Sequence, residues 1–365
     1  MTRGRPALVA SDFWDASRGF SVVWAVHLGR RHGLFAALAR TGAPCSSAAL
    51  AKKTKLDGRA VGLWCDAASA FGLLSKKGGR FGLRRGLGPL LVDEHSQEFL
   101  GGHMDYLALR SLDFESFDDL FREGPQAWRP QGHLAEAFAA ATTWDHTAFL
   151  EVLLPRAPPL RRALARGANV LDLGSGTGAF DLRVARAFPR TRFLGVDPDR
   201  KAVAEARART AKEGLEARVS FAVGRGESMA HRERFDVVYV GEVLCADGDA
   251  ARVLARCHDA LKVGGHLVVA EGLIDEARPP GDPSNALVIA MQLEFALQPA
   301  RFFTKDALRR EIEAAGFKDM RLVGAGGGLF FLWARKGGLK AARRRTTGRA
   351  ARAPRSPPPR RRPRG

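Results

Sequence analysis

Residues 169–180 read NVLDLGSGTGAF, and the organisation of the whole chain follows from this stretch. Its first five residues form an apolar run typical of a buried strand, three glycines follow at alternate positions, and apolar residues then recur at helical spacing. Glycine allows positive φ and a close approach of the backbone to a ligand, and the start of a helix presents unpaired N–H groups. The stretch therefore predicts a strand, a glycine turn and a helix that together hold a nucleotide-like ligand.

Two classes of ligand compete for this turn. Gly174, Gly176 and Ala179 fit the G-x-G-x-x-G/A pattern of NAD and FAD sites, which is weak evidence alone. Asp172 favours a ligand that carries an ammonium group, because a carboxylate there would repel a pyrophosphate. The resulting D-x-G-x-G-x-G resembles motif I of the class I S-adenosylmethionine-dependent methyltransferases. This resemblance implies S-adenosyl-L-methionine as cofactor, held by Asp172, Gly174, Ser175, Gly176 and Gly178.

A second acid follows at the distance that a ribose site requires. Asp197 stands 19 residues beyond Gly178, at the end of a strand predicted over residues 191–196. A carboxylate about 20 residues after the glycines can accept both ribose hydroxyls. The resemblance assigns Asp197 and Pro198 to the ribose end of the cofactor, and a helix cap is the alternative for Asp197.

The segment after the next predicted strand, residues 219–223, departs from the family. It reads GRGES, whereas relatives commonly have Gly-Asp there, with the aspartate accepting from the adenine amino group. Arg225 occupies the position of that aspartate. The resemblance still implies adenine contacts at Gly224, Arg225 and Gly226, through backbone groups and apolar stacking, with the carboxylate of Glu227 as the alternative.

The fourth predicted strand, residues 235–240, should end beside the transferred methyl group, at Gly241 and Glu242. In the plant-type O-methyltransferases, which this region resembles, a His-Asp pair follows the strand and supplies a general base. Cys245-Ala246 stands there instead, so that base cannot be carried over. The candidate proton acceptors are Glu242, His146 and Glu294, and no metal is expected.

Strands and helices alternate after residue 169, which predicts parallel βαβ units. Residues 320–323 and 329–334 then read as an antiparallel hairpin across three glycines. We therefore expect an α/β fold with a Rossmann-like, seven-stranded methyltransferase sheet and a terminal antiparallel hairpin. A dinucleotide-binding Rossmann domain lacks that hairpin.

The N-terminal region predicts a winged helix. Residues 17–40 read as a helix, Ser46 and Ser47 offer an N-cap for a second helix, a turn at Asp57-Gly58 leads into a third, and Gly78-Gly79 marks a hairpin. Lysines near the first cap could face DNA, but the second short helix is mostly apolar and lacks side chains that read bases. The region resembles the dimerisation domain of small-molecule O-methyltransferases, so a homodimer is expected.

Aromatic residues gather in two segments, residues 91–168 and 272–303. In the family that the chain resembles, such segments cover the acceptor, which suggests a hydrophobic or aromatic small molecule. Packing in the core is the alternative for each aromatic residue. The candidate pocket residues are His103, Tyr106, Trp144, His146, Met291, Glu294, Phe295 and Phe302.

The net charge of +19 is mostly a property of the C-terminus. Residues 335–365 hold 13 Lys and Arg and no acid, which leaves +6 for residues 1–334. Such a tail should be disordered, with at most weak attraction to nucleic acid. No segment resembles a signal peptide or a membrane span, and the four cysteines lack metal-site spacing, so a cytoplasmic protein is expected.

The expected organisation has four parts. These are a winged-helix-like dimerisation domain (1–90), a helical connector and pocket roof (91–168), an S-adenosylmethionine-binding catalytic domain (169–334) and a basic tail (335–365). The expected activity is O-methylation of a hydrophobic or aromatic small molecule. Three alternatives stay open: an RNA or protein methyltransferase tethered by the tail, an S-adenosylmethionine-binding protein without methyl transfer, and a winged-helix DNA regulator.

Overall fold

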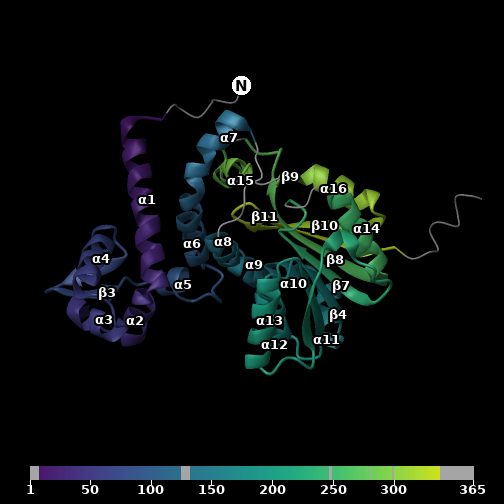
Figure 1. Cartoon of the computed structure of the whole chain (residues 1–365), viewed down its shortest axis with the longest axis horizontal. Helices are drawn as coiled ribbons and strands as arrows, with labels where there is room; N and C mark the ends of the chain where they lie inside the picture. The colour runs from purple at the N-terminus through teal and green to yellow at the C-terminus, as the bar shows by residue number, and fades with distance from the viewer. Residues whose placement is uncertain (1–7, 125–131, 246–248, 280, 298–299, 338–365) are drawn as a thin grey trace, which may run out of the picture.

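The chain forms two lobes joined by helices (Figure 1). The computed structural model describes residues 8–124, 132–245, 249–279, 281–297 and 300–337. The N-terminal lobe contains α1 (Ala10–Arg31), α2 (Leu34–Thr41), β1 (Cys45–Ser46), α3 (Ser47–Thr54), α4 (Gly58–Ala70), β2 (Leu74–Lys77), β3 (Arg80–Leu83) and α5 (Leu87–Leu91).

The single helix predicted over residues 17–40 is wrong in two respects. The helix begins earlier, at Ala10, and it ends at Arg31. Gly33 then has φ 65°, a left-handed conformation that interrupts the helical hydrogen bonds before α2 starts. Apolar periodicity continued through the break and concealed it.

The predicted winged-helix elements are present. Ser46 accepts a hydrogen bond from the backbone N–H of Ala49 and caps α3, while Asp57 caps α4 in the same way. Gly78 and Gly79 both have positive φ and turn β2 into β3, against which β1 adds a third strand. These caps and this turn carry the local sequence signals that made the region predictable.

The buried face of α4 confirms its role as a packing helix. Val61, Trp64, Cys65 and Ala68 lie in the core of the lobe.

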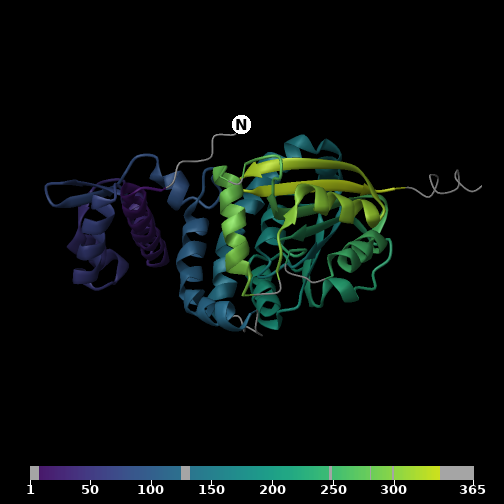
Figure 2. The ribbon, with the colours of Figure 1, turned by 90° about the horizontal axis from the view of Figure 1, so that it is seen from above.

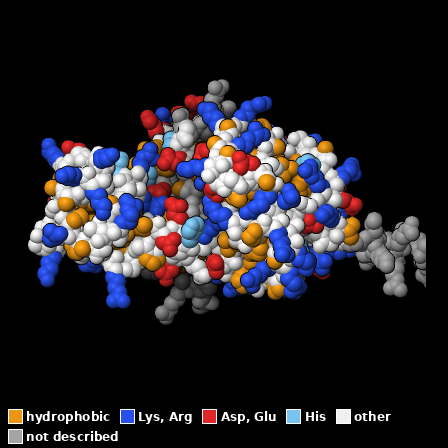
Figure 3. All heavy atoms as spheres, turned by 90° about the horizontal axis from the view of Figure 1, so that it is seen from below, with side chains coloured by type: hydrophobic (Ala, Val, Ile, Leu, Met, Phe, Trp, Pro, Cys, Tyr) orange, Lys and Arg blue, Asp and Glu red, His pale blue; other side chains and the backbone are white. Residues whose placement is uncertain are grey.

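On the face of the molecule drawn in Figure 3, Lys and Arg side chains are spread over both lobes.

Helices connect the lobes. They are α6 (Gly101–Arg110), η1 (Ser111–Ser116), α7 (Phe117–Glu123), α8 (Gly132–Ala141), α9 (Thr143–Ala148), η2 (Phe149–Leu153), α10 (Leu154–Arg156) and α11 (Pro158–Arg166). Asp105 on α6 ties them to α1, since its carboxylate accepts from Arg30 Nε at 2.7 Å and lies 3.0 Å from His27 Nδ1. Seen from above, α15 (Pro283–Phe295) stands upright beside these connector helices, between the two lobes (Figure 2).

The second lobe is an α/β layer structure. Its further elements are β4 (Asn169–Leu173), α12 (Ala179–Ala187), β5 (Arg192–Asp197), α13 (Arg200–Lys212), β6 (Val219–Val223), η3 (Gly226–Ser228), β7 (Phe235–Gly241), α14 (Ala250–Ala260), β8 (Leu261–Ile274), β9 (Phe303–Thr304), α16 (Lys305–Ala314), β10 (Phe317–Gly326) and β11 (Leu329–Lys336). The strands run in the order β10-β11-β8-β7-β4-β5-β6, and β9 pairs with the end of β8.

The terminal hairpin confirms the predicted fold class. Strands β4 to β8 pair with one another in parallel, whereas β11 is antiparallel to both β8 and β10. The hairpin is longer than predicted, and β11 includes Arg335 and Lys336, which the sequence assigned to the tail. Lys336 Nζ donates to the carbonyl of Leu261 at 2.8 Å, so this lysine belongs to the sheet. Residues 338–365 of the predicted tail lie outside the described residues.

Both faces of the sheet are buried, as expected for parallel strands. Val170 and Val237 point into one apolar cluster beneath α11 to α13. The alternate residues Leu171 and Val238 point into a second cluster beneath α14 and α16. Because helices cover the faces, the carboxyl ends of the strands are the part of the sheet that carries the candidate site.

Candidate functional site

In the glycine turn between β4 and α12, Gly174 and Gly178 are closely packed, whereas Gly176 faces open space. Gly174, Gly176 and Gly178 all have positive φ, between 51° and 75°. A Cβ atom at Gly174 would lie 2.3 Å from Val243, and one at Gly178 would lie 2.5 Å from Phe221. A Cβ at Gly176 would meet nothing within 4 Å, so a ligand can approach the backbone there.

Asp197 joins the predicted cofactor segments. Its Oδ2 accepts from the backbone N–H of Gly176 at 2.8 Å, and its Oδ1 accepts from Asp199 N–H at 2.8 Å. The side chain that caps α13 is Asp199, not Asp197. Gly224 N–H donates to the carbonyl of Asp197 at 3.0 Å, so the ends of β4, β5 and β6 meet at this residue. Pro198, next to it, is exposed.

Asp172 faces a second carboxyl group that the sequence analysis did not single out. Both Asp172 and Asp181, on α12, are buried. Burial raises the pKa of Asp181 to about 7, and burial together with Asp181 and Asp197 raises the pKa of Asp172 well above its ordinary value. Among the described residues no positive group is recorded as acting on this pair. The ammonium group of a ligand would supply the missing charge and stabilise the ionised carboxylates. An acid in the apolar first turn of α12 was the available signal.

The segment after β6 offers a carboxylate rather than a guanidinium. The side chain of Arg225 is 66% exposed, and its Nη1 lies 3.6 Å from Glu227 Oε1. Glu227 Oε2 is buried and has no hydrogen-bond partner among the described residues. The alternatives for binding the adenine amino group were backbone groups near Gly224 and Gly226, and the carboxylate of Glu227. The structure favours Glu227, because its Oε2 is an acceptor atom that receives no hydrogen bond from the described residues. Gly226 packs beside Val253 of α14 and fixes this turn.

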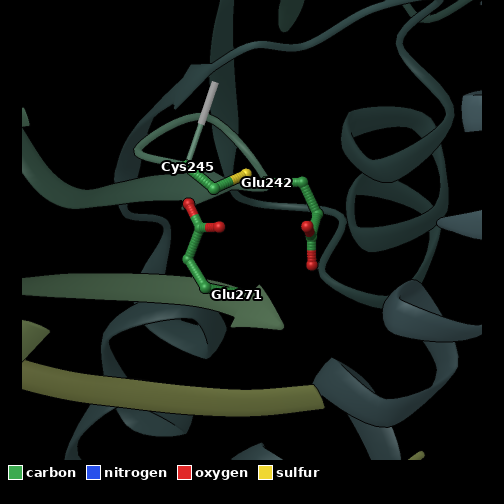
Figure 4. Close-up of side chains that lie close together, drawn as sticks. All are labelled: Glu242, Cys245 and Glu271. Carbon is green, nitrogen blue, oxygen red and sulfur yellow. The ribbon is translucent and has the colours of Figure 1, made fainter. Parts of the chain in front are cut away.

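Three side chains converge where β7 and β8 end (Figure 4). Glu242 follows β7 with φ 54°, and its Oε1 accepts from Gly272 N–H at 3.1 Å. Glu271, on β8, is fully buried, and its Oε1 accepts from Leu244 N–H at 2.8 Å. Cys245 is buried beside them. Burial raises the pKa of Glu271 to about 7; burial, then Glu271 and Asp145, raises the pKa of Glu242 well above its ordinary value.

The helical roof brings together several predicted pocket residues. Tyr106 on α6 donates its hydroxyl hydrogen to Glu294 Oε2 on α15, at 2.9 Å. Phe138 packs against Phe295 with ring centroids 5.6 Å apart, and Phe295 against Phe302 at 5.0 Å. The aromatic cluster includes Cys245 and Val288, with Met291 packed against it. His103 stacks on Tyr106 at 6.2 Å.

Two predicted pocket residues lie elsewhere. Trp144 Nε1 donates to the carbonyl of Gln97 at 2.9 Å, and its ring packs on the main core. His146 contacts Phe180 beside the glycine turn, and burial followed by Arg183 and Arg209 lowers its pKa to about 3. A histidine with this pKa is neutral and a weak base, which favours Glu294 over His146 as the proton acceptor.

Gly241 and the aromatic pair beneath it complete the floor of the site. Tyr239 stacks on Phe180 with centroids 3.9 Å apart, a contact that the sequence did not indicate. A Cβ at Gly241 would lie 2.8 Å from the Tyr239 ring, which explains the glycine at this predicted cofactor position. Glu271 was also missed, although a charged residue in the apolar run LVVAEGL was a visible signal.

The residues fit S-adenosylmethionine. The backbone at Gly176 is open to a ligand, the buried Asp172–Asp181 pair suits an ammonium group, and the Asp197 carboxylate beside the turn is of the chemical type that could accept from a ribose diol. Ser175 Oγ and Glu227 Oε2 are buried without partners among the described residues, as expected of groups that a ligand would satisfy. A pyrophosphate would meet acids instead of donors.

Comparisons with known proteins agree with this geometry. Residues 164–315 match the family model described as "Methyltransferase domain". Acetylserotonin O-methyltransferase of Rattus norvegicus is 28% identical over 177 residues, a match that covers 48% of this chain and 40% of the rat protein. The ubiquinone biosynthesis O-methyltransferase of Rhodopseudomonas palustris is 34% identical over 106 residues, which cover 28% of this chain and 39% of that protein. The sequence matches thus span less than half the length of these relatives.

Solved structures share the fold over nearly the whole chain. Human N-acetylserotonin methyltransferase, crystallised with S-adenosylmethionine, superposes with a TM-score of 0.69 at 21% identity, covering 93% of this chain and all of that chain. The shared architecture includes the helical N-terminal region as well as the sheet. Residues 164–315 therefore match the methyltransferase domain family, and the chain as a whole shares the fold of a solved S-adenosylmethionine-dependent methyltransferase.

Proposed function

We propose that the chain methylates a hydroxyl oxygen of a hydrophobic or aromatic small molecule. One observation carries this proposal: the acids Asp172 and Asp197 flank a bare glycine turn, and the Tyr106–Glu294 pair and an aromatic cluster cover the adjoining strand ends. The relatives acetylserotonin O-methyltransferase and ubiquinone biosynthesis O-methyltransferase support the same class of acceptor.

The cofactor would be held by acids and backbone groups. Asp172 would pair with the ammonium group, and Asp197 would accept both ribose hydroxyls. Glu227 would accept from the adenine amino group, in place of the aspartate that relatives have at position 225. Once bound, S-adenosylmethionine supplies a methyl group on a positively charged sulfur, so the protein mainly has to orient the acceptor and exclude water.

The acceptor would lie under the roof. Phe138, Phe295 and Phe302 offer flat apolar faces that hold an aromatic ring and keep water out. Glu294 would accept the proton from the hydroxyl, because burial raises its pKa toward the range useful for a base and its carboxylate is partly exposed. Tyr106 orients Glu294 through their hydrogen bond. Glu242 suits this step less well, since burial and two neighbouring acids favour its protonated form.

Methyl transfer to a panel of phenols tests the proposed function. We expect purified protein to transfer labelled methyl from S-adenosylmethionine to at least one hydrophobic phenol, and O-methyl ether formation identifies the atom. Transfer to RNA or protein with all phenols inert would favour the tethered alternative. Cofactor binding without transfer to any acceptor would favour a non-methylating protein.

The partner we propose is a second copy of the chain, joined through the N-terminal lobe. Phe13, Phe20 and Leu28 form an exposed apolar stripe at helical spacing on α1, and Trp14 beside it is 76% exposed. A solvated helix would carry polar residues there. Sedimentation should give a dimer, and Phe20→Glu should give monomers that keep the cofactor site. A wild-type monomer would refute this partner.

We also propose that the protein works in the cytoplasm. The cysteines Cys45, Cys65, Cys245 and Cys257 are all unpaired, which agrees with a reducing compartment. In the described part of the chain, no helix combines the length and apolarity needed to cross a bilayer. Fractionation of cells that express the full chain would test the location. The basic tail is proposed to contribute only weak, salt-sensitive contacts with nucleic acid.

A further inference from the structure

We propose that Glu242, Cys245 and Glu271 form a binding site for one thiophilic divalent cation, with Zn²⁺ as the reference ion. This goes beyond the proposed methyl transfer and departs from the expectation, drawn from the sequence, that the chain holds no metal. Glu242 and Cys245 lie in the loop after β7 and Glu271 lies near the end of β8, and the three side chains face a common space (Figure 4).

The geometry suits a single ion. One ligand atom from each of the three residues lies within 4.8 Å of the others. In a tetrahedral zinc site the ligand atoms are roughly 3.5 Å apart, given bonds of about 2.0–2.3 Å. Closing around an ion therefore needs side-chain shifts of about 1 Å. Glu242 keeps some solvent access, so an ion has an entry path.

A separate observation points to a missing ligand. Glu271 is fully buried, and its Oε2 has no hydrogen-bond partner among the described residues. One oxygen of the Glu271 carboxylate points into the space between Glu242 and Cys245 (Figure 4). A buried carboxylate oxygen without a partner is costly, and a coordinated cation would satisfy it.

The other carboxylate oxygens are already oriented by the backbone. Glu271 Oε1 accepts from Leu244 N–H at 2.8 Å, and Glu242 Oε1 accepts from Gly272 N–H at 3.1 Å. Each carboxylate is thus held by the backbone through one oxygen. Hydrogen bonds of this kind orient ligands in known metal sites. The Cys245 thiol also hydrogen-bonds to the Glu271 carboxylate, a contact that an ion bound to both groups would replace.

The thiol of Cys245 determines which class of cation the site prefers. An ammonium group gains little from a thiol, and Mg²⁺ or Ca²⁺ prefer oxygen ligands throughout. A site with one sulfur and two carboxylates favours Zn²⁺ and related ions, and three protein ligands leave a fourth position open. An acceptor hydroxyl bound at that position would lose its proton more readily, which is a role that rests on the proposed function.

Cobalt substitution tests the site directly. The full chain, stripped of metal with a chelator, is titrated with Co²⁺ and with Zn²⁺ in the absence of cofactor and acceptor. We expect one equivalent to bind, with a sulfur-to-cobalt charge-transfer band that Zn²⁺ displaces. Cys245→Ser should abolish this band and weaken Zn²⁺ binding by on the order of 100-fold. Cys257→Ser, which changes a buried cysteine of α14 outside the cluster, should leave both unchanged.

A second variant guards against misfolding of the first. Glu242→Gln should weaken Zn²⁺ binding while the charge-transfer band stays, because the sulfur remains. Absence of stoichiometric binding to wild type, or a band that survives in Cys245→Ser, would overturn the proposal. Because these titrations contain no cofactor or acceptor, that failure would leave the proposed methyl transfer untouched.

Discussion

The carboxylate of Asp197 accepts a hydrogen bond from the backbone N–H of Gly176, with 2.8 Å between Oδ2 and N, although 21 residues separate them. Asp197 thereby holds the turn that it is proposed to share with the cofactor. We predict that Asp197→Ala lowers the affinity for S-adenosylhomocysteine by roughly 10–100-fold, the cost of losing charge-assisted hydrogen bonds. Isothermal titration calorimetry measures this loss.

The neighbouring acid is the matched control. Asp199 caps α13 through Lys201 N–H and makes no contact with the glycine turn that is recorded in the structure. Asp199→Ala should cost about 1 kcal/mol of stability while leaving the affinity close to wild type. Equal losses of affinity in both variants would mean that Asp197 acts only by supporting α13.

The glycines of the turn should respond differently to alanine. Gly178→Ala places a Cβ 2.5 Å from Phe221 at φ 75°, so we expect a lower melting temperature without ligand. Gly176→Ala is also strained, at φ 51°, but its Cβ meets no atom within 4 Å, so we expect a smaller fall in melting temperature than for Gly178→Ala, together with weaker S-adenosylhomocysteine binding. Thermal melts with and without ligand separate the two effects, and the reverse pattern would contradict the assigned roles.

The acid limb of the pH–rate profile should reflect ionisation of the Glu294 carboxyl group. Burial raises its pKa above 4.5, and the base must be ionised, so kcat/KM should rise as the pH increases through this raised pKa. Glu294→Gln should lower kcat by on the order of 100-fold and remove this limb. Glu276→Gln, which alters an exposed acid outside the roof, should change neither.

Tyr106→Phe refines this test. The hydrogen bond from Tyr106 lowers the pKa of Glu294, so its removal should move the acid limb to higher pH. A profile that stays in place while kcat falls would assign Tyr106 a purely structural role.

The Asp172–Asp181 pair should make the apoprotein less stable at higher pH. The folded-state pKa of Asp181 is raised from 3.8 to about 7, so the folded protein binds its proton more tightly than the unfolded chain does. This contribution is fully present below about pH 4 and is lost as the pH rises through about 7. Melting temperatures should therefore fall over this range, and less so in Asp181→Asn. An unchanged slope in that variant would contradict the buried pair.

Most of the fold could be predicted from the sequence, because the helix caps and turns that define it are encoded by adjacent residues. The cap at Ser46, the turns at Asp57-Gly58 and Gly78-Gly79 and the glycine turn after β4 each depend on a few adjacent residues. The break at Gly33 escaped because one left-handed residue hardly disturbs apolar periodicity.

The cofactor segments were predictable for a similar reason, since their spacing along βαβ units is fixed. Contacts between distant segments were not. Tyr106 and Glu294 are 188 residues apart, and only the packing of α6 against α15 brings them together. Asp181 and Glu271 needed knowledge of which neighbours face them. The one signal in the sequence was that each is an acidic residue within an apolar run, and both are buried in the structure.

Calorimetric titration of the full chain with S-adenosylhomocysteine and, separately, with NADH tests the central claim most directly. The arrangement of Asp172 and Asp197 around the glycine turn predicts one S-adenosylhomocysteine site per chain and no measurable uptake of NADH. Preference for NADH, or binding of neither compound by folded protein, would contradict it.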